Sequence, residues 1–565
     1  MAEKAQKRDP ISRTESRGNW RLILLMVCFV ACYGAVGVRM GLLAATDPAE
    51  PPFERDGGAN RPARAEIVDR SGHLLAGNLP AWSLYANPRE IKDPVAVATA
   101  LDPIFPEIDQ ATLHRKLSSN RSFVWIKRPV TPRERQAVHD LGFPGVFFGN
   151  REMRIYPAGA ATAHIVGGVK AATEAVNYAE FTGAGGLEQH FNERLSDRKQ
   201  AAEPLQLSLD LAVQQGVRDE LRIGMERLTA RGASAILMKA KTGEIVSMVS
   251  LPDFDPNERP QLWRGEAAYN PRFNRAAQGR YELGSTFKVL TAAMALDAGV
   301  ATSNTIIKTP PSLRYGRHTI GESHRMDPEM PLEDVVVRSS NVGSARIAMM
   351  VGTRRFKSYL DRLGFFDPSG VELSEAARAK TLMPDYWTDL STMTISFGHG
   401  LAASPVHLAA SYATLANDGT RVFPSLVKGG IPTGKQVFSQ KTAREMLRIM
   451  REVVVRGTAK RANVPGYEVG GKTGTAEKVG PGGYDKNRVI ATFASVFPAS
   501  APEFVLIVSL DEPTDRSGRK PVRGAGRTAV PVAASIIRRV APILGLRPLQ
   551  EGDSASVAAV DVTTE

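Results

Sequence analysis

The longest apolar stretch of the chain lies near its N-terminus. Residues 22–38 contain no charge, and six Lys or Arg against three Asp or Glu precede them. An uncharged run of this length predicts a membrane-spanning helix over residues 22–43, and its basic flank predicts a cytoplasmic tail over residues 1–21. A cleaved signal peptide is the alternative, but its apolar core usually spans only about 7–15 residues. We expect a single-pass anchor in the inner membrane and a periplasmic body.

Between residues 44 and 203 the pattern changes twice. Residues 44–63 are rich in Pro, Gly and charge without an apolar period, which predicts a linker. From residue 64, short alternating segments such as 65–78 predict a hairpin, and segments such as 131–143 predict helices. No concentrated set of polar residues in this region looks catalytic. We expect an elongated, mixed pedestal domain over residues 64–203, serving as a spacer or docking unit.

Residues 204–546 have the pattern of a larger α/β (α+β) domain. Asp210 is a good N-cap between a strand and an amphipathic helix, and residues 233–252 form two apolar strands around a Lys-Thr-Gly-Glu turn. Two further strands, 489–500 and 503–513, follow helical material. Strands at both ends with helices between them predict a largely antiparallel sheet flanked by helices. Residues 547–565 are small and polar, which predicts a disordered tail.

Composition limits the function of this body. The chain has 565 residues, 43% hydrophobic and 23% charged, as expected of a folded protein with two to four domains. Cys28 and Cys32 both lie in the N-terminal apolar stretch, so no disulfide framework, redox pair or cysteine-rich metal site is available. A net charge of +13 suits nucleic acid, an anionic membrane or an acidic polymer. The predicted export leaves no role for nucleic acid.

A serine followed by a lysine three residues later is the first candidate for chemistry. The pattern occurs four times, beginning at Ser196, Ser285, Ser425 and Ser517. Only Ser285 precedes a long apolar segment, which predicts a buried helix over residues 286–299 with Lys288 one turn after the serine. A partly desolvated lysine can accept the serine proton near neutral pH, and N–H groups at the helix start can hold an oxyanion. The alternative is that Ser285 is only an N-cap.

Two later motifs supply possible partners. Ser339 and Asn341 place a hydroxyl and a carboxamide two residues apart, and we expect both at a helix start, where an N-cap is again the alternative. Lys-Thr-Gly occurs at Lys241, which its hairpin turn explains, and at Lys472. Around Lys472, Gly470, Gly471 and Gly474 leave the backbone bare where a ligand could lie against an edge strand.

The order Ser-x-x-Lys, Ser-x-Asn, Lys-Thr-Gly is that of penicillin-binding proteins and class A β-lactamases. The chain resembles the class B penicillin-binding proteins, the D,D-transpeptidases that crosslink bacterial peptidoglycan. Residues 64–72, 154–169 and 183–195 resemble pedestal motifs of this family. Two residues depart from the family pattern: Ala65 replaces a usual glycine and Leu283 a usual proline.

The resemblance implies a role for each matched residue. Ser285 would attack the D-Ala–D-Ala carbonyl of a stem peptide and form an acyl-enzyme. Lys288 would be its base, Ser339 a relay for the leaving-amine proton, and Asn341 a donor to the substrate amide. The N–H groups of Ser285 and Thr475 would form the oxyanion hole. Lys472 is implied as a further catalytic residue, which would bind the terminal carboxylate together with the hydroxyls of Thr473 and Thr475. The implied substrate-binding residues are Thr473, Gly474 and Thr475. No metal or cofactor is implied.

Residues 396–409 resemble the division-specific members of the family, the FtsI type, with His399 at a variable position. This implies septal wall synthesis with an FtsW-type glycan polymerase and other divisome proteins, and Gly37-x-x-x-Gly41 is a weak small-residue signal for helix packing. β-Lactams would acylate Ser285. The alternatives are an elongation-type enzyme, a catalytically silent scaffold, a β-lactam sensor and a β-lactamase, although a β-lactamase would be shorter and lack the pedestal.

Overall fold

The structure is a computed structural model of the whole chain. It describes residues 11–45, 64–175, 178–197, 199–258, 263–266, 269–430, 432, 434–480 and 483–549. The chain forms two compact units, Met1–Arg61 and Pro62–Glu565. The predicted linker, apart from its first two residues, and the predicted tail from residue 550 lie outside the described residues. The predicted boundary between residues 203 and 204 falls inside the second unit and stays a prediction.

The first unit contains the helix α1, Ile11–Ala45. Its window Ile23–Met40 has a mean hydropathy of 2.1, lies within the predicted anchor, and is not buried against the protein. The helix begins at Ile11, before the predicted anchor, so part of the predicted cytoplasmic tail is also helical. Helix α1 therefore fits a single membrane crossing.

The pedestal is built on one long strand. β2 (Leu74–Ala86) pairs antiparallel with β1 (Ile67–Val68), β3 (Val124–Val130) and β4 (Val146–Ile155), which confirms the predicted hairpin. β1 also pairs parallel with β7 (Leu205–Gln206). Helices near the far end of β2 enclose a small core of their own. The remaining pedestal elements are α2 (Pro94–Leu101), α3 (Gln110–Leu117), α4 (Pro132–Leu141), α5 (Ala163–Val166), β5 (Gly168–Ala175), β6 (Tyr178–Gly185), α6 (Gly186–His190) and α7 (Asn192–Ser196).

A buried cluster of charges joins the three pedestal segments that carry the family motifs. The carboxylate of Glu188 accepts hydrogen bonds from Arg64 Nε at 2.6 Å and Arg154 Nε at 2.8 Å. Arg154 also donates to the carbonyl of Ala65 at 2.8 Å. Ala65 is buried and does not have a positive φ, so alanine is accommodated where the family usually has glycine. Residues far apart in sequence thus close the base of the pedestal.

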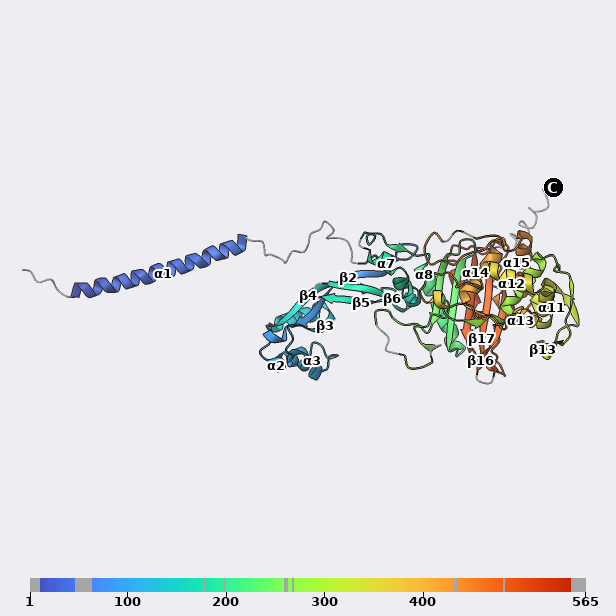
Figure 1. Cartoon of the computed structure of the whole chain (residues 1–565), viewed down its shortest axis with the longest axis horizontal. Coiled ribbons are helices and arrows are strands. Elements are labelled where there is room, and N and C mark those ends of the chain that lie inside the picture. Colours follow the sequence, from blue (N-terminus) through green and yellow to red (C-terminus); the bar gives the residue numbers. More distant parts are fainter. Residues whose placement is uncertain are drawn as a thin grey trace, which may run out of the picture. The chain divides into compact units, whose positions relative to one another are not determined.

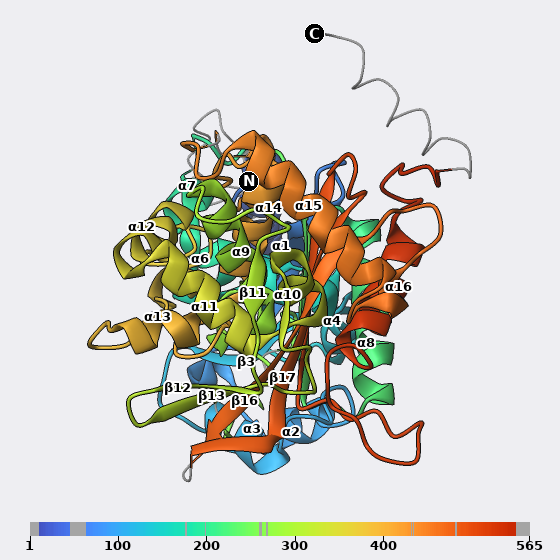
Figure 2. The same cartoon turned by 90° about the vertical axis from the view of Figure 1, so that its right-hand side faces the viewer.

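A five-stranded antiparallel sheet forms the centre of the larger domain, as predicted. Its strand order is β16-β17-β18-β8-β9, so β16 lies at an edge. Helices α8 and α16 pack on one face, and α14 packs on the other with α15 beside β16 (Figure 2). The bounds are α8 (Leu211–Arg227), β8 (Gly232–Lys239), β9 (Ile245–Leu251), α14 (Pro405–Ala416), α15 (Gln440–Val455), β16 (Gly470–Gly480), β17 (Gly483–Phe497), β18 (Phe504–Asp511) and α16 (Ala529–Val540).

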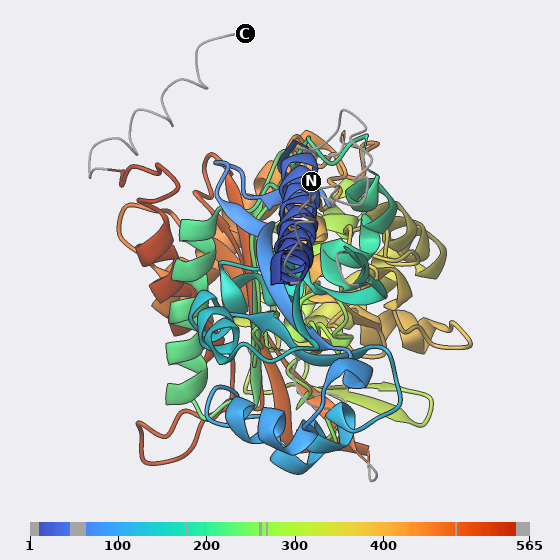
Figure 3. The ribbon, with the colours of Figure 1, turned by 90° about the vertical axis from the view of Figure 1, so that its left-hand side faces the viewer.

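Local signals explain several of these elements. The Asp210 carboxylate caps α8 by accepting from the N–H groups of Ala212 and Val213, as its position before the helix predicts. Strands β8, β9 and β18 are buried along almost their whole length and consist mostly of apolar residues, because helices cover both faces of the sheet. Figure 3 shows the green α8 and red α16 together on one side of the body and the yellow helices on the other.

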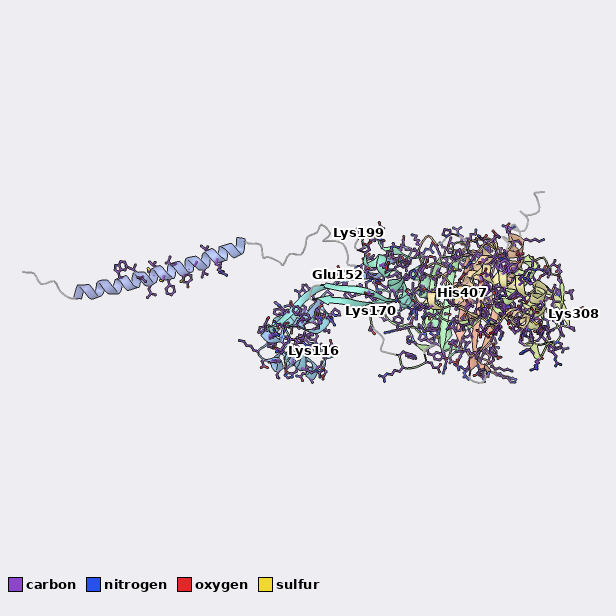
Figure 4. All side chains as sticks on the ribbon, viewed as in Figure 1. Lys116, Glu152, Lys170, Lys199, Lys308 and His407 are labelled. Atoms are coloured by element: carbon purple, nitrogen blue, oxygen red, sulfur yellow. The ribbon has the colours of Figure 1, made fainter. Side chains whose placement is uncertain are left out.

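The helical part beside the sheet contains α9 (Lys288–Asp297), which packs against α15 and against α11 (Asn341–Val351). In Figure 1, α11 and α13 (Asp389–Ile395) lie at the end away from the pedestal. In Figure 4, Lys116 on α3 marks the small lobe and His407 on α14 marks the larger one. The other elements are β10 (Tyr281–Glu282), β11 (Ile306–Lys308), β12 (Ser312–Tyr315), β13 (His318–Gly321), β14 (Glu329–Pro331), α10 (Leu332–Arg338), α11 (Asn341–Val351), α12 (Thr353–Leu363), α13 (Asp389–Ile395) and β15 (Ala402–Ala403).

Candidate active site

The segment that carries Ser285 is a 3-10 turn, Gly284–Phe287, which runs directly into α9. The apolar stretch after Ser285 is helical and buried as predicted, but the α-helix starts at Lys288. Neither the turn nor α9 has a side-chain cap, so the N-cap interpretation of Ser285 is wrong. The Ser285 side chain is half-buried, and within the described part of the chain no hydrogen bond of its hydroxyl is recorded. The hydroxyl is therefore not committed to a structural contact.

Lys288 is the most connected residue of the site. Its side-chain nitrogen is buried, donates to the Ser339 carbonyl at 2.6 Å and to Asn341 Oδ1 at 2.7 Å, and lies 3.1 Å from the Ser339 hydroxyl. Burial holds the pKa of Lys288 well below its usual value, and the positive charge of Lys472 lowers it further. The structure therefore joins two of the sequence motifs through one lysine.

The sequence predicted Ser339 at a helix start, and this prediction is wrong. It ends α10 as the C-cap residue, with the left-handed backbone φ 69° and ψ 46°, and Ser340 is the N-cap of α11. Asn341 is the first residue of α11. A left-handed serine is strained, because its Cβ approaches the following carbonyl oxygen. This sharp turn between two helices brings the Ser339 carbonyl, the Ser339 hydroxyl and Asn341 to the same nitrogen.

Glu322, which the sequence did not single out, stands behind this turn. Its carboxylate accepts from the backbone N–H groups of Asn341 at 2.8 Å and Val342 at 3.1 Å, and from the Ser340 hydroxyl. It follows β13, in a separate hairpin, so no local spacing connects it to the motif. The negative charge fits the N-terminus of α11 and partly opposes the lowering of the Lys288 pKa. Glu322 fixes where Asn341 begins its helix.

Lys472 lies on the edge strand β16 and is fully buried. Burial lowers its pKa to about 7. Its nitrogen donates only to the Thr473 carbonyl, at 3.3 Å, among the hydrogen bonds recorded for the described residues. Two lysines with depressed pKa values and no carboxylate in contact are unusual inside a protein, and such groups cluster at functional sites.

Successive side chains of a strand point to opposite faces, so Thr473 and Thr475 share one face of β16 and Lys472 lies on the other. The hydroxyls of Thr473 and Thr458 lie 2.7 Å apart, and the Thr475 hydroxyl accepts from Ala525 N–H at 3.1 Å. Thr475 is exposed, whereas Lys472 is not. The structure thus places Lys472 and the two threonines on opposite sides of the strand, a separation that the motif itself does not show.

Backbone contacts bring the nucleophile segment against β16. A side chain on Gly474 would lie 2.7 Å from the Leu283 carbonyl, and one on Gly284 would lie 3.2 Å from the Thr475 carbonyl. Gly284 also donates to the carbonyl of Gly398 at 3.1 Å. Any side chain on Gly398 would meet Gly284 at 2.0 Å, so the 396–409 segment closes on the nucleophile turn only with glycine there. Ser285 and Thr475 are thereby held at adjacent backbone positions.

Two residues near this turn have contacts that the sequence left open. Leu283 is buried in the main core with φ −76°, an angle that a proline also adopts, so leucine keeps the backbone of the usual residue. His399 Nδ1 lies 3.2 Å from Glu282, which also accepts from Gly400 N–H and the Tyr484 hydroxyl. These contacts link β10, the 396–409 segment and β17 beside the turn.

Several known proteins are similar to this chain in sequence and fold. Residues 233–538 match the penicillin-binding protein transpeptidase domain, and residues 59–203 match the penicillin-binding protein dimerisation domain. A probable peptidoglycan D,D-transpeptidase FtsI of Caulobacter vibrioides is 36% identical over 95% of this chain and 90% of its own length. The peptidoglycan D,D-transpeptidase FtsI of Escherichia coli is 29% identical over 97% of each chain.

One solved structure shows the same fold. Penicillin-binding protein 3 from Mycobacterium tuberculosis, in complex with aztreonam, superposes with a TM-score of 0.66. The alignment covers 87% of this chain and 98% of that one at 24% identity. At this identity the likeness shows the fold alone.

Proposed function

We propose that this chain, which belongs to the class B penicillin-binding proteins, crosslinks peptidoglycan stem peptides through a serine acyl-enzyme. β-Lactams acylate the same serine. The observation that carries this proposal is the Lys288 nitrogen, which is buried, low in pKa and bonded to both Ser339 and Asn341. Burial shifts this lysine toward its neutral form, which can accept the proton of a serine nucleophile.

In the first half of the reaction, Ser285 Oγ forms a bond to the carbonyl carbon of the penultimate D-Ala while its proton passes to neutral Lys288. Ser285 lies in the 3-10 turn and Lys288, three residues later, begins α9, a spacing that sets both side chains on one face. The carbon–nitrogen bond to the terminal D-Ala then breaks. The leaving amine takes the proton from Lys288 through the Ser339 hydroxyl, which lies 3.1 Å from that nitrogen.

In the second half, the amine of a neighbouring stem peptide attacks the acyl carbon. The amine loses a proton along the same path, the bond to Ser285 Oγ breaks, and the serine regains its proton. The N–H groups of Ser285 and Thr475 would stabilise the oxyanion in both steps, because the backbone contacts of Gly284 hold them close together. Asn341 would donate to the substrate amide.

The edge strand β16 supplies the place for the peptide. An edge presents unpaired N–H and C=O groups to which an extended peptide can add as another strand. Thr473 and Thr475 would bind the terminal carboxylate through their hydroxyls, and its negative charge would favour the protonated form of Lys472 on the other side of the strand. Gly474 leaves room for the nucleophile turn at this point.

For its place in the cell we propose an N-terminus in the cytoplasm, a periplasmic body and action at the division septum. The basic residues before the apolar window of α1 support the orientation. Two relatives with FtsI names support the septal role. The partners would be an FtsW-type glycan polymerase and other divisome proteins. Localisation of a fluorescent fusion at mid-cell tests this proposal, and a signal spread along the side wall would favour elongation.

Labelling with a fluorescent penicillin tests the reaction. The chain with Ser285 should be labelled and Ser285→Ala should stay dark. Ser196→Ala is the matched control, because Ser196 also precedes a lysine by three residues but lies exposed on the pedestal; it should label like the parent chain. A labelled Ser285→Ala chain would overturn the assignment of the nucleophile. Release of D-Ala from a stem peptide distinguishes an active enzyme from a silent scaffold.

A further inference from the structure

A strongly basic loop lies between β18 and α16. We define the basic loop as residues 516–523, with the sequence RSGRKPVR. Arg516, Arg519 and Lys520 are exposed and Arg523 is half-buried. The sequence motifs do not include this loop, and the reaction proposed above does not use it.

The base of the basic loop is held in place. Asp515 and Val522 exchange two backbone hydrogen bonds, at 2.8 and 2.9 Å, and so close the loop like a short hairpin. The Asp515 carboxylate accepts from the Ser517 hydroxyl at 2.6 Å, from the Ser517 N–H group at 2.9 Å and from Arg527 Nε at 2.9 Å. These bonds lower the pKa of Asp515 to about 2, so the carboxylate stays ionised and keeps the base closed at neutral pH.

The cations of the loop have no counter-charge among the residues that the structure describes. Across the described ranges no ion pair is recorded for Arg516, Arg519, Lys520 or Arg523. The acidic residues just before the loop are already paired, Asp511 with Lys478 and Glu512 with Lys478 and Arg488. The recorded contacts of these pairs are 2.8–2.9 Å. Four positive charges on a closed loop form a local excess, which attracts anions.

The loop is also joined to the candidate substrate strand. Just after the loop, Ala525 N–H donates to the Thr475 hydroxyl at 3.1 Å. A side chain on the next residue, Gly526, would lie 2.9 Å from the Thr458 carbonyl. The hydroxyl of Thr458 in turn contacts the hydroxyl of Thr473. The chain that carries the cations is therefore tied to both threonines proposed to hold the terminal carboxylate.

We propose that the basic loop is a second recognition site for the substrate, binding carboxylates of an acidic peptide in addition to its terminal one. The proposal rests on the proposed function, because a stem peptide on β16 would lie beside the loop. Exposed ion pairs are individually weak and screened by salt, so the loop acts by several contacts together. The alternative is that the four cations only interact with solvent. The hydrogen-bonded base of the loop and the bond from Ala525 to Thr475 argue against this.

Binding to two peptides tests the proposal. Both end in D-Ala–D-Ala with a free terminal carboxylate, but one carries internal free carboxylates and the other has them amidated. Affinity is measured by fluorescence anisotropy with the full chain carrying Ser285→Ala in detergent, so that no turnover occurs. The loop variant combines Arg516→Gln, Arg519→Gln and Lys520→Gln. A control variant combines Arg354→Gln, Arg355→Gln and Lys441→Gln, which remove three exposed charges from α12 and α15.

We expect the loop variant to bind the acidic peptide about tenfold more weakly at low salt and the amidated peptide within about twofold of the parent. The control should bind both like the parent, and 0.5 M salt should remove the difference. Equal weakening for both peptides, equal weakening in the control, or no weakening would overturn the proposal. A failure of the proposed function is read separately, as absent penicillin labelling and D-Ala release in the chain with Ser285.

Discussion

Two groups of buried charges lie in the second unit, and they differ in how each charge is compensated. In the pedestal, Arg64 and Arg154 both contact the carboxylate of Glu188. In the larger domain, Lys288 and Lys472 are equally buried, yet no ion pair is recorded for either among the described residues. The first group keeps its charges because they are paired. In the second group, burial lowers the pKa of both lysines, and no carboxylate among the described residues is in contact to raise it again.

The choice of residue follows from this difference. A guanidinium stays protonated in any protein environment and forms several directed bonds, which suits a permanent structural contact. A lysine loses its proton when desolvated, which suits a base or a proton relay. The same amount of burial therefore produces a structural joint in one region and a reactive group in the other.

The largest expected effect comes from removing the base. Lys288→Met should reduce the rate of acylation by a fluorescent penicillin about 100- to 10,000-fold, because the serine proton has no acceptor. The fold should persist, since methionine fills a similar volume without charge. Lys199→Met is the control, as Lys199 completes the exposed Ser196 pattern. A rate within threefold of the parent in Lys288→Met would remove the lysine from the mechanism.

Breaking the paired group should cost stability instead. Glu188→Gln leaves two buried guanidinium groups without a counter-charge, so we expect a loss of about 3–5 kcal/mol in the free energy of unfolding. Urea unfolding of the detergent-solubilised chain measures it. Glu193→Gln, an exposed residue on α7, should change stability by less than about 0.5 kcal/mol. Similar curves for both variants would mean that the pedestal cluster is not the joint described here.

Removing the buried lysine of β16 should have the opposite sign. The pKa of Lys472 falls from 10.5 to about 7, so folding disfavours its charged form. Lys472→Met should raise the free energy of unfolding by about 2–4 kcal/mol at pH 7 while penicillin acylation falls.

The gain should shrink with pH. Between pH 7 and 10.5 the unfolded chain binds more protons at Lys472 than the folded chain, so the parent gains stability as the pH rises. At pH 10.5 the advantage of Lys472→Met should be below about 1 kcal/mol. Lys241→Met, in the exposed Lys-Thr-Gly turn, should show neither effect. A destabilised Lys472→Met chain at pH 7 would mean that Lys472 holds the fold.

The smallest effect concerns Glu322. Glu322→Gln keeps an acceptor for the Asn341 N–H group but removes the charge that raises the Lys288 pKa. Without this charge the pKa of Lys288 falls further, so Lys288 is a weaker base and we expect acylation to slow by about 3- to 10-fold. The fall in rate at acid pH should move to lower pH, because Lys288 then stays neutral to a lower pH. The pH profile of the acylation rate measures the shift. Glu329→Gln, an exposed neighbour on β14, should leave the profile in place.

Much of the fold was readable from local patterns. The apolar window of α1, the β1–β2 hairpin, the Asp210 cap of α8 and the strands β8, β9, β17 and β18 all follow from periodicity and turn residues, and the structure confirms them. The three motifs were also readable, because each keeps its chemistry within four consecutive residues. Their order along the chain identified the family.

The tertiary structure decided how these residues meet. The left-handed turn at Ser339, the carboxylate of Glu322 behind Asn341 and the close approach of Gly398 to Gly284 join segments far apart in sequence. Propensity and periodicity describe only neighbours along the chain, so they carry no information on such contacts. Burial is likewise a property of the folded whole. The sequence shows two lysines in two motifs, and only packing removes the water that would keep both of them charged.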